Sequence, residues 1–129
     1  MIYLPDTNIL IGVITGRRAY ASLLQKFIEE RHLLATCSIV VSEVCAGMRP
    51  SEEARTTALL ESLEFLPVTF EIAKRAGHIR RQFTKAKGRT LSLADATIAA
   101  VAMANACTLI TENIKDFEIA DVRVLVPKS

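Results

Sequence analysis

The sequence predicts an α/β fold: a mainly parallel five-stranded sheet flanked by helices on both faces. Short apolar runs alternate along the chain with segments of helical periodicity, and strands separated by helices need crossover connections, which favour parallel pairing. The chain has 129 residues, of which half are hydrophobic and only nine are Gly or Pro. This length and composition predict one packed domain over residues 1–129 and exclude a disordered chain.

Two strands, each followed by helical segments, are predicted in the first part of the chain. Pro5-Asp6-Thr7-Asn8 gives turn and cap chemistry between a short apolar strand and the first helix. An amphipathic stripe from Tyr20 to Ile28 predicts a second helix ending near His32, and Ser38 can cap a third that ends at Gly47. The predicted elements here are strand 2–4, helix 9–14, helix 20–28, strand 33–36 and helix 38–47.

The rest of the chain repeats this alternation. Pro50 and two acids open a helix that buries leucines 59, 60 and 63, and Ser92 begins a helix that is apolar almost all round. Between them, a long helix with Ile72, Ala76, Ile79 and Phe83 on one face gives way at Lys87-Gly88. Strands are predicted at 65–68, 108–111 and 122–126. We expect the aromatic rings at 20, 70 and 83 to be used in packing, which leaves no exposed aromatic platform for stacking of bases.

No membrane segment is expected, because the longest apolar run, Ile98–Ala104, is far shorter than the ~20 residues that span a bilayer. The N-terminus also lacks a basic region followed by a cleavable apolar segment. The cysteines Cys37, Cys45 and Cys107 are odd in number, lie in apolar stretches and lack CxxC spacing. They are expected to be reduced core residues of a cytoplasmic protein.

Three acids stand out from their surroundings. Asp6 directly follows the first strand, Glu43 interrupts an apolar helix, and Asp95 is the only acid of the apolar helix that Ser92 begins. Each has a plain structural alternative: Asp6 can be a helix cap, Glu43 can face solvent, and Ser92-x-x-Asp95 fits a capping box. A carboxylate in a buried helix is nevertheless unfavourable unless it is paired or bound to a cation.

A fourth group follows the predicted strand at 108–111, where Thr111 precedes Asn113 and Asp116. Both are plausible turn residues, and either can offer oxygen to a cation. Ligands of parallel sheets lie beyond the carboxyl ends of the strands, where acids meeting at one edge repel unless cations neutralise them. The acids therefore predict Mg²⁺, or Mn²⁺, and metal-assisted hydrolysis of a phosphodiester substrate.

These motifs, in this order, resemble the PIN-domain ribonucleases, in particular the VapC toxins of bacterial toxin–antitoxin pairs. The resemblance rests on Asp6-Thr7-Asn8, Ser42-Glu43, Leu93-Ala94-Asp95-Ala96 and Thr111-x-Asn113-x-x-Asp116-Phe117, and it spans essentially the whole chain. It implies an endoribonuclease that uses Mg²⁺ or Mn²⁺, a homodimer, and inhibition by a cognate VapB-like antitoxin.

Carried over residue by residue, the resemblance assigns the catalytic and metal-binding acids to Asp6, Glu43 and Asp95. Thr7 matches the small hydroxyl residue that accompanies the first acid, with Asn8 and Thr111 as supporting residues. Asn113 stands where many members have Asp, so the fourth acidic role is assigned provisionally to Asp116. Pro5 is a second departure, replacing the usual aliphatic residue without removing a ligand.

Residues 72–89 carry seven basic residues and no acid, although the net charge of the chain is only +2. These residues can be the solvated face of an amphipathic helix, or they can hold RNA phosphates. Lys85, Lys87 and Arg89 are the candidates for RNA binding, because they lie before the helix of Asp95. Target choice by RNA shape is then expected rather than a linear base code.

Two other classes compete with a nuclease. A phosphoacceptor receiver needs a pair of acids after its first strand and an Asp after a central strand, and neither is present. A non-catalytic PIN-like module that binds RNA or protein stays open, because Asn113 replaces an acid. P-loop, HExxH and GxSxG motifs are absent from the sequence, which removes the commonest nucleotide-binding, zinc-protease and serine-hydrolase alternatives.

Overall fold

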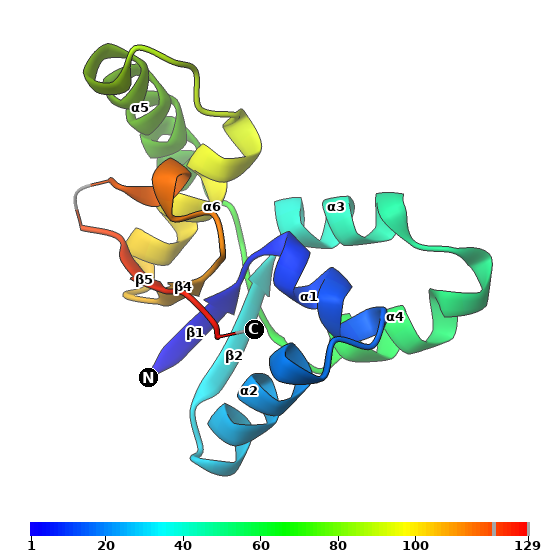
Figure 1. The fold of residues 1–129 in the computed structure, drawn as a ribbon. Helices are drawn as coiled ribbons and strands as arrows, with labels where there is room; N and C mark the ends of the chain where they lie inside the picture. Colours follow the sequence, from blue (N-terminus) through cyan, green and yellow to red (C-terminus); the bar gives the residue numbers. More distant parts are fainter. Residues whose placement is uncertain (120, 129) are drawn as a thin grey trace.

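The computed structural model describes residues 1–119 and 121–128. Five strands form one sheet, all pairs parallel, in the order β3-β2-β1-β4-β5 (Figure 1). The strands are β1 (Ile2–Pro5), β2 (Leu33–Cys37), β3 (Glu64–Leu66), β4 (Thr108–Ile110) and β5 (Arg123–Leu125). The predicted fold class is confirmed, and β3 ends before the predicted limit because Pro67 has no N–H to donate to a neighbouring strand.

Helical segments connect the strands, and each except η2, which was expected to be a turn, begins close to a predicted start. The α-helices are α1 (Thr7–Ile14), α2 (Arg18–Glu29), α3 (Ser38–Gly47), α4 (Glu53–Glu61), α5 (Phe70–Lys87) and α6 (Leu93–Ala104), and the 3₁₀ turns are η1 (Pro50–Glu52) and η2 (Ile114–Phe117). Helix α5 ends at Gly88, whose φ of 73° is the left-handed conformation that glycine adopts without strain. Ser92 caps α6 by accepting a hydrogen bond from the backbone N–H of Asp95 at 3.0 Å.

Strand order reverses beside β1, which pairs with β2 on one side and with β4 on the other. Strands β2 and β3 are added on one side of β1. The chain then crosses back, and β4 and β5 are added on the other side. Such a reversal opens a crevice at the carboxyl ends of the two strands that flank it. The edge beyond β1 and β4 is therefore where the fold places a ligand.

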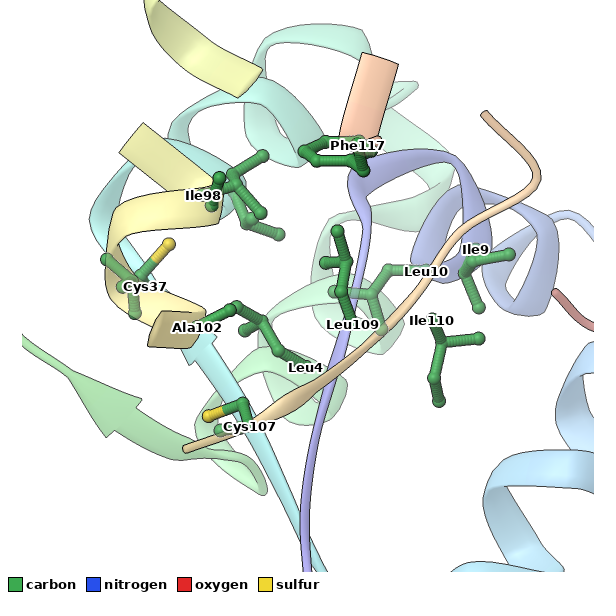
Figure 2. Packing of buried hydrophobic residues seen from close by; sticks show 14 of the residues in the cluster. Leu4, Ile9, Leu10, Cys37, Ile98, Ala102, Cys107, Leu109, Ile110 and Phe117 are labelled. Carbon is green, nitrogen blue, oxygen red and sulfur yellow. The ribbon is translucent and has the colours of Figure 1, made fainter. Parts of the chain in front are cut away.

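Helices cover both faces of the sheet. Figure 1 shows α1 and α2 on one side of β1 and β2, with α5 and α6 on the other. Within the core, Leu4 of β1 points toward Ala102 of α6, whereas Ile110 of β4 lies on the side of Ile9 from α1 (Figure 2). The predicted burial of α6 is confirmed, since every residue from Ile98 to Ala102 is buried. Its first turn, which carries Asp95, is less buried than its middle.

Two predictions about the core are wrong. Phe70 is 76% exposed, because it lies about 200° around α5 from the buried stripe that begins at Ile72. Cys45 is exposed as well, since α3 buries Val40 and Val44 and the following residue rotates toward solvent. Among the described residues, no helix combines the length and apolar character that crossing a bilayer requires.

Candidate active site

Asp6 lies at the crevice between β1 and β4. Its backbone N–H donates to the carbonyl oxygen of Ile110 at 2.8 Å, which extends the pairing of the two strands by one residue. Its side chain accepts two hydrogen bonds of 2.8 Å, Oδ1 from the backbone N–H of Thr7 and Oδ2 from the hydroxyl of Thr111. The carboxylate is thus fixed in a residue that is only 7% exposed.

Glu43 reaches the same edge from α3, which starts directly after β2. The hydroxyl of Thr7 donates to Glu43 Oε1 at 2.6 Å, so one threonine joins the first two predicted acids. Glu43 itself is exposed, as the alternative of a solvent-facing position predicts. The two interpretations are compatible here, because a carboxylate that binds a solvated ion must be open to water.

Asp95 is half-buried in the first turn of α6, and its side chain lies within the electrostatic reach of the other acids. Burial raises the pKa of Asp95 to about 6, and the charges of Asp6, Asp116 and Glu43 act in the same direction. Burial also raises the pKa of Asp6, against the hydrogen bonds from Thr111 and Thr7. Both interpretations of Asp95 therefore hold: its backbone N–H donates to the capping residue Ser92, and its carboxylate lies near the other acids.

Asp116 is held differently, by a cation rather than by burial. Arg89 donates from Nη1 to Asp116 Oδ1 at 2.6 Å, and its Nη2 donates to the carbonyl oxygen of Lys115 at 3.2 Å. Asn113 donates from Nδ2 to Asp116 Oδ2 at 2.5 Å. Although partial burial acts to raise the pKa of Asp116, these hydrogen bonds and the charge of Arg89 hold it below its ordinary value.

Asn113 and Asp116 thus occupy distinct positions after β4. The backbone N–H of Asn113 donates to Thr111 Oγ1 at 3.0 Å, and the same hydroxyl donates to Asp6. Hydrogen bonds therefore run from Asp6 through Thr111 and Asn113 to Asp116. Of the two, only Asp116 adds a negative charge to the acidic group.

The donor set suits a hard divalent cation. Four carboxylates that repel one another gain from a positive charge between them, and oxygen is the ligand that Mg²⁺ and Mn²⁺ prefer. Across the described residues, no three His, Cys, Asp or Glu side chains are grouped closely enough to enclose a metal by themselves.

The three candidate RNA-binding residues are exposed at the carboxyl end of α5 and in the loop that follows. Lys87 pairs with Glu118 at 3.2 Å, and Arg89 pairs with Asp116. Lys85 forms no ion pair within residues 1–119 and 121–128. Arg89 therefore contacts the acidic group directly, which the sequence interpretation did not anticipate.

Sequence reasoning also missed a pocket of about 430 Å³ beside Asp6. Arg17, Tyr20 and Glu112 line it together with Asp6, Asn8, Thr111 and Asn113. Tyr20 was assigned to packing alone, and Arg17 lies in a loop with no recognisable motif. Glu112 could have been found, because it follows Thr111 at the edge where the acids were placed.

The shifted pKa of Asp95 makes stability depend on pH when no divalent cation is present. Its pKa is about 6 in the folded protein, against ~3.9 in an unfolded chain, so the folded state holds more protons between these values. The free energy of unfolding therefore falls as pH rises from about 4 to about 6. Asp95→Asn, which keeps the backbone bond to Ser92, is expected to stabilise the protein by about 1–2 kcal/mol at pH 7 and hardly at pH 4.

Chemical unfolding in EDTA at both pH values measures this difference. Asp121→Asn is the control, because it makes the same substitution at an exposed residue. An equal effect of Asp95→Asn at pH 4 and pH 7 would contradict the burial and charge assigned to this carboxylate.

The fold and the site together define a class of protein: a parallel α/β domain with an acidic group at the point where its strand order reverses. The family model described as "PIN domain" matches residues 3–122, so the chain belongs to the PIN domain family. Within it, the chain is 32% identical over 114 residues to ribonuclease VapC19 of Mycobacterium tuberculosis, covering 88% of this chain and 90% of that protein. The resemblance to the VapC family is confirmed by this similarity.

Solved structures of toxin–antitoxin proteins have a similar fold. VapBC2 from Rickettsia felis, bound to a DNA fragment from its promoter, superposes with a TM-score of 0.86 at 25% identity and covers 99% of this chain and 100% of that chain. A toxin–antitoxin complex from Klebsiella pneumoniae has a TM-score of 0.81 at 32% identity, with 98% of each chain covered. The likeness extends over the whole fold and is not confined to the acidic edge.

Proposed function

We propose that this protein is a metal-dependent endoribonuclease that acts in the cytoplasm as the toxin of a VapBC-type pair. The observation that carries the proposal is the series of hydrogen bonds that links Glu43, Asp6 and Asp116 at the β1–β4 edge. Asp95 lies near enough for the charges of these acids to raise its pKa. Support comes from the ribonuclease that is 32% identical over most of the chain. The substrate is RNA, hydrolysed at its phosphodiester bonds.

Mg²⁺, or Mn²⁺, bound by these carboxylates would make a coordinated water more acidic and offset the negative charge that develops on the phosphate. The chain's own part is to hold the acids in place. Thr111 and the backbone of Thr7 orient Asp6, and the hydroxyl of Thr7 orients Glu43. Asp95 is fixed by the capped first turn of a buried helix. These hydrogen bonds restrict the orientation of Asp6 and Glu43 and the position of Asp95 before substrate arrives.

Basic residues at the end of α5 would hold the RNA backbone. Arg89 contacts Asp116, and the exposed residues Lys85 and Lys87 precede it at the end of α5. Phosphate contacts of this kind make affinity fall steeply with salt, because each neutralised phosphate releases counterions. Exposed Phe70, at the opposite end of the same helix, is a single ring and does not amount to a platform for successive bases.

A VapB-like antitoxin is the proposed partner, because similar structures are described as toxin–antitoxin complexes. A homodimer is proposed from the family resemblance. Binding of an antitoxin would restrain the activity of the toxin in the cell.

The test incubates the purified protein with total RNA in Mg²⁺ or Mn²⁺ and maps new 5′ ends by sequencing. Discrete new ends are expected from the unaltered protein and none from Asp95→Asn. Asp121→Asn serves as the control for expression and folding. Absence of cleavage at every metal concentration would favour the non-catalytic PIN-like module.

Arg89 is expected to influence cleavage through Asp116. Arg89→Gln removes the cation that lowers the pKa of Asp116 and leaves that carboxylate held by Asn113 alone, which should reduce cleavage about 10- to 100-fold. Arg89→Lys keeps the charge but lacks the planar fork that bonds Asp116 and the Lys115 carbonyl together, so it should restore only part of the rate.

Single-turnover rates on a short RNA measure this effect, and Lys26→Gln is the matched control because it removes a positive charge from exposed α2. If Arg89→Gln and Lys26→Gln cleaved equally fast, Arg89 would have no role in positioning Asp116.

A further inference from the structure

We propose that the pocket beside Asp6 is a nucleotide subsite, which holds a ribonucleotide next to the phosphodiester that is cleaved. The inference rests on the proposed nuclease function and adds the residues that choose the substrate. The pocket has a volume of about 430 Å³, within the ~300–1,000 Å³ typical of small-ligand sites. Its walls come from the start of α1, from Arg17 and Tyr20, and from Glu112 and Asn113 after β4.

The position of the pocket connects it to the acidic group. Asp6 forms part of its wall, and Thr111, whose hydroxyl donates to Asp6, forms another part. Asn113 lines the pocket while its Nδ2 donates to Asp116, so its amide oxygen and its second amide N–H are left for a ligand. A nucleotide in the pocket would therefore lie beside Asp6 and beside Asn113, which is hydrogen-bonded to Asp116.

Arg17 is held in place from three directions. Its backbone N–H donates to the carbonyl oxygen of Gly12 at 2.7 Å. Its guanidinium carbon lies 4.0 Å from the centroid of the Tyr20 ring, and Nη1 is 3.1 Å from Glu112 Oε1. Contact with an aromatic face and an ion pair both restrict the plane of the guanidinium. The group is thus oriented before any ligand binds.

Tyr20 is 1% exposed, so its ring supports the guanidinium from below and is not itself a surface for a base. Gly12 makes this packing possible, because a Cβ at that position would lie 2.4 Å from Tyr20 Cδ2. Gly12 therefore packs against Tyr20, and Tyr20 packs against Arg17, which lines the pocket. Arg17 therefore has partners on two sides of its guanidinium, although its side chain is about half exposed.

The chemistry of the lining fits a nucleotide. Arg17 and Glu112 are each about half exposed, at 48% and 49% of their side chains, and an ion pair in such contact with water contributes little stability. A phosphate can therefore replace Glu112 as the partner of Arg17, using the planar fork for two hydrogen bonds. The outer face of the guanidinium can instead stack on a base, as in recognition of single-stranded RNA.

The polar groups around Arg17 are suited to reading the base. Asn8 has an amide that donates and accepts, Asn113 offers its amide oxygen, and Glu112 accepts from an amino group or a 2′-hydroxyl once Arg17 is engaged. Because Asn8, Glu112 and Asn113 are exposed, a site built from them would discriminate through the hydrogen bonds that the correct base makes and the wrong base loses. We therefore expect a preference at one nucleotide beside the cut, in addition to any recognition of RNA shape.

The first arm of the experiment measures cleavage of a randomised RNA oligonucleotide library in Mg²⁺ by the unaltered protein, Arg17→Gln, Glu112→Gln and the control Lys26→Gln. Arg17→Gln is expected to raise KM about 10- to 100-fold, with a smaller change in kcat. Glu112→Gln should relax the base preference at one position flanking the cut. Thermal unfolding of each variant checks that these exposed substitutions leave the fold intact.

The second arm titrates the unaltered protein with the four nucleoside 5′-monophosphates and follows the NMR signals of Arg17 Nε and the Asn8 side-chain amide. Cleavage that depends on Arg17 supports both proposals. Cleavage with the same KM and preference in all variants overturns the subsite and leaves the nuclease standing. Shifts at Arg17 and Asn8 without any cleavage support a nucleotide site and overturn the nuclease. Neither shifts nor cleavage overturns both.

Discussion

Asp6→Asn is expected to reduce RNA cleavage by more than ~100-fold, because it removes a proposed metal-binding carboxylate, and even outer-shell partners of metal ligands affect activity by up to ~100-fold. The fold should survive. Asparagine can accept the bond from the Thr7 backbone with its oxygen, and Thr111 can rotate its hydroxyl to accept from the new amide. The substitution also relieves the burial of a charge that raises the pKa of Asp6.

Initial rates on a short RNA and thermal unfolding, measured side by side, separate lost chemistry from lost structure. Asp121→Asn is the matched control: the same atoms change, at an exposed residue, and asparagine tolerates the φ of 72° found there. If the thermal midpoint of Asp6→Asn is much lower than that of the unaltered protein, lost activity could result from unfolding. Asp6→Ser is therefore measured as a second variant that also lacks the carboxylate. Full cleavage by either folded variant contradicts the assignment of Asp6.

Removal of divalent cations is expected to abolish cleavage altogether, and addition of Mg²⁺ or Mn²⁺ should restore it. The physical reason is the mutual repulsion of the four carboxylates, which have no other described source of neutralisation except Arg89 at Asp116. Without cations, an RNA phosphate would approach a site of the same charge. Dialysis against EDTA, followed by titration with each metal, measures the loss and the recovery.

A second readout does not depend on activity. Because a cation that binds only the folded state stabilises it, Mg²⁺ should raise the thermal midpoint of the unaltered protein at pH 7. The increase should be smaller for Asp95→Asn, in which one repelling charge has been removed. Cleavage that continues undiminished in EDTA, with EDTA presaturated with Mg²⁺ as the control, contradicts the metal-dependent mechanism.

Much of the fold could be predicted because it depends on local signals. Alternation of apolar runs with helical stripes implied parallel strands, and single residues such as Ser92 and Gly88 marked helix ends that the structure confirms. Phe70 was misplaced because a ring in an amphipathic segment does not by itself say which face it occupies. Its angular offset from Ile72 would have placed it in solvent.

The position of the proposed site could be predicted from residues that directly follow a predicted strand. Asp6 could be placed because a residue after a strand lies at a known edge of the sheet. The pairings could not, since the contact of Arg89 with Asp116 joins positions 27 residues apart and that of Arg17 with Glu112 joins positions 95 apart. Such contacts depend on how loops pack, and loops show no periodic pattern in the sequence from which their packing can be predicted. The catalytic role of the acids stays a prediction.

The crossing of the chain from β3 back to β4 also sets the order in which the two sides of the acidic edge are synthesised. Thr111, which bonds a residue 105 positions earlier, and Asp116 belong to the last strand-to-turn segment to leave the ribosome before β5. A polypeptide that stops before Thr108 holds Asp6, Glu43 and Asp95 but lacks the hydroxyl that donates to Asp6 Oδ2 and the carboxylate of Asp116. If the proposed nuclease needs all four acids, the chain would gain its activity only after β4 and the turn that follows have been synthesised.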